Sequence, residues 1–174
     1  TALPALRIPR ADLGALERSV IGFLVTGGAE LDRQAALLEA RLERIALEGA
    51  GPAALVAAIA TFLGRAVALE GRRGDALAVH APVDVPDAGP AVTRYHARPR
   101  RAVALRVPLP AAGGPAGSLA LLGERPVGEL ERVAVARIAG LLALELSRDE
   151  AVRRASDQAR RAEALPAGGP PWVV

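Results

Sequence analysis

The stretch "RAVALEGRRGDALAVHA", residues 65–81, decides the fold because it predicts a β-hairpin. Two apolar runs, 65–70 and 75–81, flank the turn sequence "GRRG", and glycines at such positions favour a reversal of the chain. A second pair follows, because residues 102–109 alternate in hydrophobicity, "PAAGGPAG" supplies a turn and residues 118–123 supply a last strand. The sequence therefore predicts a small antiparallel sheet.

Helical patterns precede and follow these strands. Residues 12–48 carry two heptad-like seams separated by Gly27-Gly28, which predict two helices or one helix kinked at the glycines. Pro52 suits the first position of a short apolar helix that ends at Leu63. A final helix, residues 130–165, is apolar nearly all round in its first half and highly charged in its second. We expect an α+β fold, with a GAF/PAS-like antiparallel sheet flanked by N- and C-terminal helices.

The composition excludes several classes of function. The chain has 174 residues, 51% of them hydrophobic, and no cysteine, which removes disulfides and thiolate sites. Its 22 basic residues are all arginine, so it has no Schiff-base or phosphate-loop lysine. A net charge of +3 is a weak argument for nucleic-acid binding. The absence of cysteine fits a cytoplasmic protein, which we expect. No apolar run could span a membrane and no signal peptide is visible, so we expect no membrane partner.

The sequence offers little chemistry for catalysis. None of its four serines lies in a nucleophile-elbow motif, and we expect no enzymatic activity. His80, Asp84, Asp87 and His96 could ligate a metal, but they lack a compact spacing, and we expect neither a metal nor another cofactor. The arginine-rich segment 94–106 contains one aromatic residue, which favours a solvated basic loop over a platform for nucleic acid.

One face of the predicted sheet is a candidate ligand site. Alternation places small residues and His80 on one face of 75–81, and small residues and Arg106 on one face of 102–109, while the bulky residues opposite should pack on the helices. Residues 82–101 have the composition of a long loop that could close over the small-residue face. We expect a mostly apolar cavity for an anionic metabolite, bordered by His80, Arg94, Tyr95, His96 and Arg106. The alternative is that the alanines contact another element closely and that Arg106 forms a salt bridge.

The helical seams are candidate dimer interfaces. We expect a homodimer held by the terminal helices, through Leu31, Leu38, Leu42, Ile45, Leu141, Val152, Ala155 and Ala159. Packing of the N-terminal seam on the chain's own core is an equally open alternative. A monomer in light scattering at high concentration would count heavily against the dimer.

Three stretches resemble the sensory region of PucR/CdaR-type bacterial transcription regulators. They are residues 24–71, residues 103–123 ("VALRVPLPAAGGPAGSLALLG") and residues 128–155. In that family a GAF-like domain precedes a GGDEF-like domain and a C-terminal helix-turn-helix. The resemblance implies a domain that binds a small effector and relays its state through helices to a downstream DNA-binding domain. No helix-turn-helix is visible in this chain, so DNA would be a partner only through a domain absent from it. The alternative is a pure dimerisation module with a degenerate sensor fold and no ligand.

We expect four regions along the chain. Residues 1–48 should form an N-terminal helical dimerisation arm, and residues 49–126 a GAF-like sheet domain. Residues 127–165 should form a C-terminal signalling helix, and residues 166–174 a linker with the start of a missing domain. Pro166 should end the signalling helix. The last residues, "PPWVV", look like the entry into the family's GGDEF-like domain. We expect these last residues to be exposed, disordered or borrowed by a neighbouring molecule, because Trp172 has lost its own core.

Overall fold

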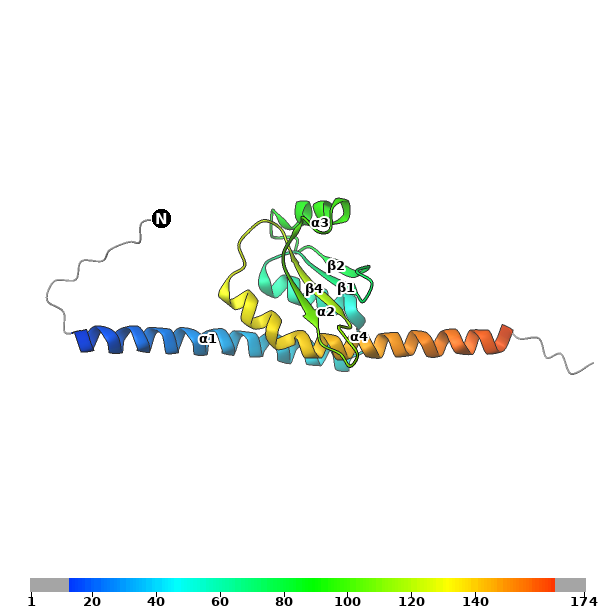
Figure 1. Ribbon diagram of the computed structural model, residues 1–174, viewed down its shortest axis with the longest axis horizontal. Coiled ribbons are helices and arrows are strands. Elements are labelled where there is room, and N and C mark those ends of the chain that lie inside the picture. Colours follow the sequence, from blue (N-terminus) through cyan, green and yellow to red (C-terminus); the bar gives the residue numbers. More distant parts are fainter. Residues whose placement is uncertain (1–12, 165–174) are drawn as a thin grey trace, which may run out of the picture.

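The computed structural model describes residues 13–164, and this part of the chain has four helices and one antiparallel sheet (Figure 1). The helices are α1 (Leu13–Leu47), α2 (Gly51–Leu63), α3 (Ala88–Ala97) and α4 (Glu129–Ala164). The strands are β1 (Val67–Gly71), β2 (Ala76–His80), β3 (Val103–Leu109) and β4 (Gly117–Leu122). They lie in the order β2-β1-β4-β3. The expected α+β class is confirmed.

Both predicted hairpins are present, and a long-range pair joins them. β1 pairs with β2, and β3 pairs with β4, each in antiparallel fashion. β1 also pairs with β4, from Val67 opposite Leu121 to Gly71 opposite Gly117. The two hairpins therefore meet along their first and last strands, and β1 and β4 form the centre of the sheet.

Helices cover the two faces of the sheet unequally (Figure 1). α1, α2 and α4 lie on one face, and α3 lies on the other. Residues such as Leu69 and Leu121 face the three helices, where they meet the buried side chains of Ile59 and Ile138. The opposite face is built from small residues under α3, where Tyr95 is buried. Bulky apolar residues thus form the main core, and the second core is thin.

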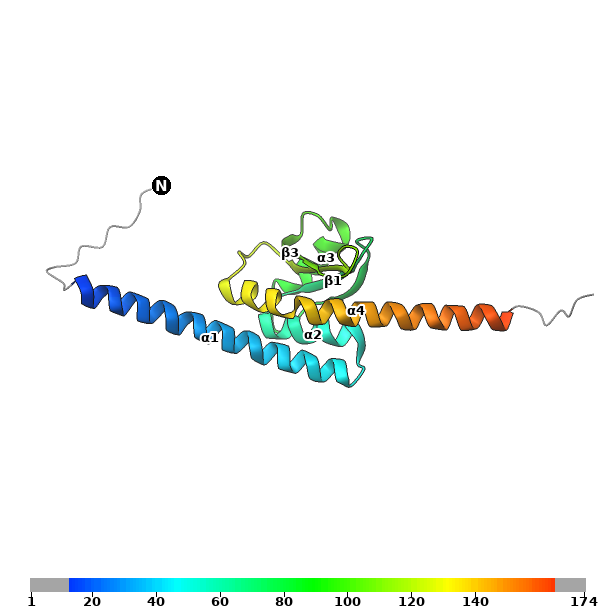
Figure 2. The ribbon, with the colours of Figure 1, turned by 60° about the horizontal axis from the view of Figure 1, so that its bottom comes forward.

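α1 is one continuous helix through Gly27 and Gly28, so the expectation of two helices is wrong. Figure 2 shows it without a sharp bend at that point. A glycine costs a helix about 1 kcal/mol relative to alanine but leaves the backbone hydrogen bonds in place. The long flanking helical segments, of which the second packs on the core, outweigh that cost.

Residues 82–101 are not a continuous loop, because α3 occupies Ala88–Ala97. Only three of its residues are buried, namely Ala88, Ala91 and Tyr95, at the 3-4 spacing of one helical face. Two alanines and a tyrosine give a weak periodic signal, which explains the error. Pro90 is tolerated because it lies in the first turn of the helix.

The start of α4 is fixed by a buried ion pair. Arg65, which follows α2, contacts the Glu131 carboxylate with both N···O distances at 3.2 Å, and its Nε donates to the carbonyl of Leu122 at 2.8 Å. Glu131 also accepts from the backbone N–H of Gly128 at 2.7 Å, in the manner of a capping box. This bond supports the first turn of α4. The network ties α4 to both α2 and β4.

The two long helices extend beyond the sheet in opposite directions (Figure 2). The N-terminal half of α1 forms one arm, and the end of α4, from residue 147, forms the other, which we call the C-terminal arm. None of the described helices is long and apolar enough to cross a membrane. The expectations for residues 166–174, including Trp172, concern positions outside the described residues.

Candidate functional site

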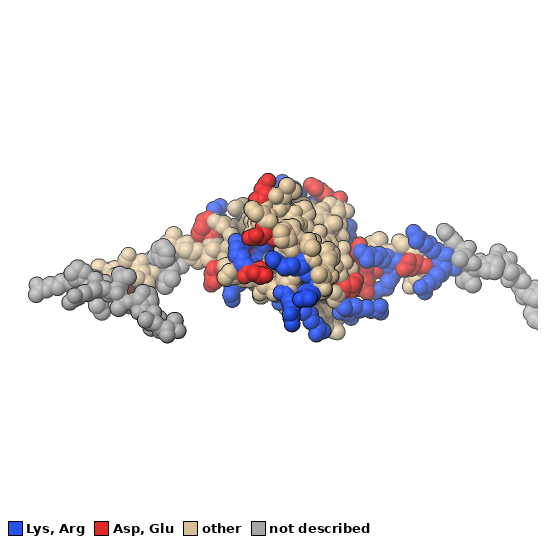
Figure 3. All heavy atoms as spheres, turned by 90° about the horizontal axis from the view of Figure 1, so that it is seen from above, with Lys and Arg blue, Asp and Glu red and all other residues tan. Residues whose placement is uncertain are grey.

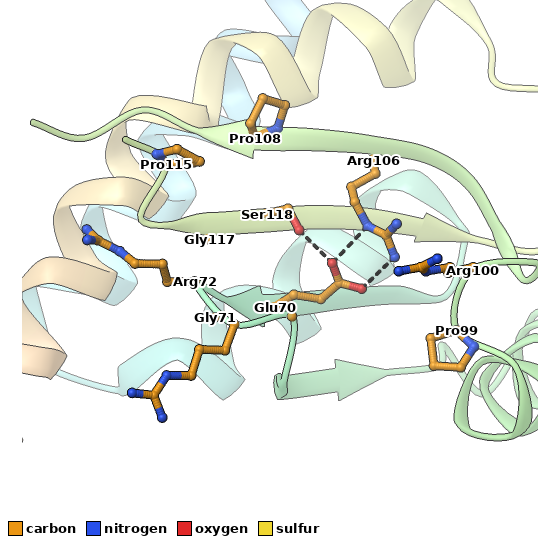
Figure 4. A pocket seen from close by; sticks show the side chains of 12 residues that line it. Glu70, Gly71, Arg72, Pro99, Arg100, Arg106, Pro108, Pro115, Gly117 and Ser118 are labelled. Carbon is orange, nitrogen blue, oxygen red and sulfur yellow. Dashed lines mark hydrogen bonds and ion pairs between the residues drawn. The ribbon is translucent and has the colours of Figure 1, made fainter. Parts of the chain in front are cut away.

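Glu70 is the centre of a polar cluster on the α3 face of the sheet (Figure 4). Only 3% of this residue is exposed. Arg106 donates to both carboxylate oxygens, from Nε at 2.8 Å and from Nη2 at 2.9 Å. Ser118 Oγ donates at 2.5 Å and Tyr95 Oη donates at 2.8 Å. Four donated hydrogen bonds compensate the carboxylate for the water it has lost.

These donors come from three elements that the sheet brings together. Glu70 on β1 lies directly opposite Ser118 on β4. Arg106 lies on β3, opposite Ala120, and therefore on the same face as Ser118. Tyr95 reaches down from the buried side of α3. The register of three adjacent strands thus defines the cluster, and α3 covers one end of it.

The pKa shifts within the cluster favour the charged forms of Glu70 and Arg106. Burial opposes ionisation of Glu70, but the hydrogen bonds from Arg106, Ser118 and Tyr95 outweigh it and hold the pKa of Glu70 below its usual value. Burial, and then the bond to Glu70, raise the pKa of Tyr95. The bond to Glu70 raises the pKa of Arg106. At neutral pH the cluster holds an ionised carboxylate, an arginine cation and a neutral phenol.

A cavity of about 560 Å³ opens beside this cluster. Its floor includes Glu70, Arg106 and Ser118, and its walls include three prolines, Pro99, Pro108 and Pro115. Three further arginines line it, namely Arg72 and Arg73 from the β1–β2 turn and Arg100 from the segment after α3. The volume lies in the range of small-ligand sites.

The cavity carries an excess of positive charge. Its lining contains four arginines and one glutamate, a net charge of +3. Arg106 is compensated by Glu70, and Arg72 is attracted to Glu150 of α4. Arg72, Arg73 and Arg100 form no ion pair within 4 Å with another described residue. Figure 3, which looks onto the α3 side, shows basic side chains gathered along one edge of the body. The arrangement suits an anion, because arginine binds carboxylates and phosphates in bidentate fashion.

Of the five residues predicted to border a cavity, the structure places only some near Glu70. Arg106 and Tyr95 meet at Glu70, but only Arg106 lines the cavity. Arg94 lies on an exposed side of α3 and pairs with Glu124 at 3.6 Å, away from this cavity. His96 is exposed, with its ring edge-on to the ring of Tyr95 at 5.8 Å. Arg94 and His96 therefore do not belong to this site.

His80 lies on the opposite face of the sheet, so its predicted place is wrong. It pairs with Val67, whose side chain faces the helices. The cause is an irregularity at Leu69/Glu70, where Leu77 is an extra residue of β2. The extra residue reverses the alternation beyond it, and Val79 therefore packs on the α3 side. A similar irregularity in β3 places Val103 on the α3 side too, although it was expected on the helices.

The structure also corrects the predicted dimer interface. Leu38 and Leu42 are 0% exposed because they pack in the chain's own core, and so they cannot contact a second copy. Ile45 and Leu141 pack partly against the same core, and Leu31 is partly buried. Val152, Ala155 and Ala159 are exposed on the C-terminal arm. Packing on the chain's own core thus explains the inner half of α1, and the arm residues stay candidates.

Sequence reasoning missed Glu70, Arg72, Arg73, Arg100 and Ser118 as residues of the site. One signal was available for Glu70, which is the single charged residue in the apolar run 66–70 and shares its strand face with alanines. A charge placed there requires a buried partner. The arginines gave no signal, because they lie in a turn and a connecting segment that only the fold brings together.

No three potential metal ligands come together among residues 13–164. In the comparisons with known proteins, neither a family model nor a curated protein matches this chain.

Proposed function

We propose that the chain is the sensory and dimerisation domain of a bacterial transcription regulator, and that it binds a small organic anion in the cavity beside Glu70. The observation that carries the proposal is the excess of arginines around that cavity. The cavity lies on the face of the sheet that α1, α2 and α4 do not cover. A cavity lined by arginines and prolines suits a ligand with one carboxylate or phosphate and an apolar part.

The two arms support the relay part of the proposal. A sensor domain must transmit its state, and α4 runs from the main core into the C-terminal arm without a break. Figure 3 shows acidic and basic side chains alternating along that arm. Its exposed residues Val152, Ala155 and Ala159 recur at heptad-like spacing, as in a helix that pairs with a second copy.

The resemblance to PucR/CdaR-type regulators supplies the rest of the proposal. DNA would be contacted through a downstream domain outside this chain, in a cytoplasmic homodimer. The cavity acts by binding and needs neither a cofactor nor a catalytic step.

A second candidate function is a dimerisation module without a ligand. The observation that favours it is the complete internal pairing of Glu70, because Arg106 is already compensated by a carboxylate of the chain itself. In that case the cluster only stabilises the fold, and the arginines at its rim are solvated.

Thermal unfolding in the presence of small anions separates the two functions. We expect phenyl phosphate or benzoate to raise the melting temperature by about 5–10 °C at one hundred times its Kd. The variant Arg73→Ala/Arg100→Ala should lose most of this shift. The variant Arg98→Ala/Arg101→Ala removes the same charge outside the cavity and should keep it. If no anion shifts the wild type, or if both variants lose the shift equally, the binding site is elsewhere or absent.

A further inference from the structure

The β1–β2 turn separates two cavities and contributes residues to both. The first is the anion cavity beside Glu70. The second has a volume of about 300 Å³ and is lined by Asp149, Glu150 and Arg153 at the root of the C-terminal arm. Gly71, Arg72 and Arg73 line both cavities. One short turn therefore touches the candidate ligand site and the helix that leaves the body.

The sheet is thin between these two cavities. Gly71 of β1 lies directly opposite Gly117 of β4, so neither residue of this one pair carries a side chain beyond Cα. Leu146 of α4 packs against this gap, since a Cβ atom on Gly117 would lie 3.1 Å from its Cδ1. The root of the arm thus contacts backbone that also lines the anion cavity.

Arg72 reaches from the turn toward α4, whereas Arg100 and Arg106 approach Glu70 from the other side (Figure 4). The acids it meets already have partners on their own helix. Asp149 pairs with Arg153 at 2.5 Å and Glu150 pairs with Arg154 at 2.6 Å. The hydrogen bond from Arg154 lowers the pKa of Glu150, and the charge of Arg72 lowers it further. Arg72 thus lines the same cavity as these acids and attracts Glu150, but it forms no ion pair with either of them among the described residues, so an anion beside Arg106 could compete for it.

We infer that Arg72 couples the two cavities: an organic anion bound beside Arg106 draws the Arg72 guanidinium into the anion cavity and releases the root of the C-terminal arm. The inference rests on the proposed function, because it requires an anion in that cavity. The ligand class is a carboxylate or phosphate carrying a ring that packs on Pro99, Pro108 and Pro115. Binding and arm position are linked through a single side chain, and so each must affect the other by the same factor.

Amide hydrogen exchange of the whole chain tests this inference. We expect saturating phenyl phosphate, or benzoate if the carboxylate is preferred, to raise exchange two- to five-fold at residues 147–154, where the arm loses its tie to the turn. Exchange at residues 134–143, in the core half of α4, should stay unchanged. Phenol, which is neutral at pH 7, should have no effect at the same concentration.

Three variants distinguish the coupling from simple binding. Arg72→Ala should weaken anion binding several-fold and abolish the response of the arm. Glu150→Gln should show raised exchange at the arm without ligand and should bind the anion a few-fold more tightly than the wild type, because Arg72 no longer has to leave this carboxylate. Arg98→Ala, a charge-matched control that lines neither cavity, should behave as the wild type.

The outcomes separate this inference from the proposed function. If the wild type binds no anion, the proposed function itself fails. If the wild type binds an anion and Arg72→Ala retains the response at residues 147–154, the site stands and the coupling through Arg72 is wrong. If binding leaves exchange at the arm unchanged in the wild type, the coupling is also wrong.

Discussion

At the scale of a single residue, Glu70 matters most for stability. The fold buries its carboxylate and supplies hydrogen-bond donors to both carboxylate oxygens. Arg106 is 40% exposed while the Glu70 side chain is 4% exposed, so the pair lies at the boundary between core and cavity. Buried carboxylates that lose a partner are costly, because the remaining charge is left without water. The residue is therefore both a structural group and the floor of the candidate site.

The stability of the protein should depend on pH through Glu70. Its folded pKa lies below the unfolded value of about 4.5, so its contribution is present above pH 4.5 and is lost as the pH falls through the folded pKa. We expect the free energy of unfolding of the wild type to decrease below pH 4.5 more steeply than that of Glu70→Gln. Denaturant unfolding measured between pH 7 and pH 3 gives both profiles.

A surface pair provides the control for that comparison. Glu39 contacts Arg137 at 2.5 Å, and both side chains are partly exposed. Glu39→Gln should cost about 0–1 kcal/mol at pH 7, because a partly exposed ion pair contributes little to stability. Parallel acid profiles for the wild type and Glu70→Gln would contradict the assigned role of Glu70.

Alternation along β3 was enough to place Arg106 on the correct face, but the partner of Arg106 lies on another strand. Glu70 and Arg106 are 36 residues apart, and only the register of β1, β4 and β3 brings them together. For His80, alternation along β2 predicted the wrong face. One extra residue in β2 shifts every later residue of the strand to the other face. A bulge leaves no clear signal in a single short strand, so strand faces beyond it cannot be predicted from alternation.

At the scale of elements, the contact between β1 and β4 depends on Gly117. A Cβ atom at this position would lie 2.2 Å from the carbonyl oxygen of Glu70, which is backbone and cannot move aside cheaply. Gly117→Ala should therefore destabilise the protein by about 1–3 kcal/mol, as overpacking does. It should also displace Glu70 and reduce anion binding. Denaturant unfolding measures the first effect, and calorimetry with phenyl phosphate measures the second.

A second glycine makes the matched control for Gly117. Gly140 lies in α4 with no atom within 4 Å of a Cβ built on it. Gly140→Ala should stabilise the helix by about 0.5–1 kcal/mol, since alanine is the better helix former. If Gly117→Ala is as well tolerated as Gly140→Ala, the close approach of the two central strands is wrong.

Some elements were predicted accurately and others were not, because long elements with a large buried face give a stronger periodic pattern than short ones. Two hairpins and the long helices have strong periodicity, and they were placed to within a few residues. α3 was missed because its buried face consists of Ala88, Ala91 and Tyr95 within a segment rich in proline and charge. For α1 the sequence left open two helices or one kinked helix, because glycines resemble breakers in a sequence, although a helix that packs on a core tolerates them.

At the scale of the whole molecule, the chain is a body with a helical arm at each side (Figure 2). The heptad spacing in α1 predicted an apolar seam but did not say what covers it, since a core and a second copy require the same side chains. The structure assigns Leu38 and Leu42 to the core. Val152, which is 59% exposed, remains on the arm with the alanines that follow it. Of the residues predicted for a dimer interface, the structure therefore leaves exposed those on the arm.

The central claim is that the cavity beside Glu70 binds a small organic anion, and a nuclear magnetic resonance titration with phenyl phosphate tests it most directly. We predict saturable amide shift changes that are largest at Gly71, Gly117 and Ser118, which line the cavity. Gly64 and Gly123, which line a different cavity near the start of α4, should change little. Changes centred on Gly64 and Gly123, or no saturable change at any amide, would contradict the claim.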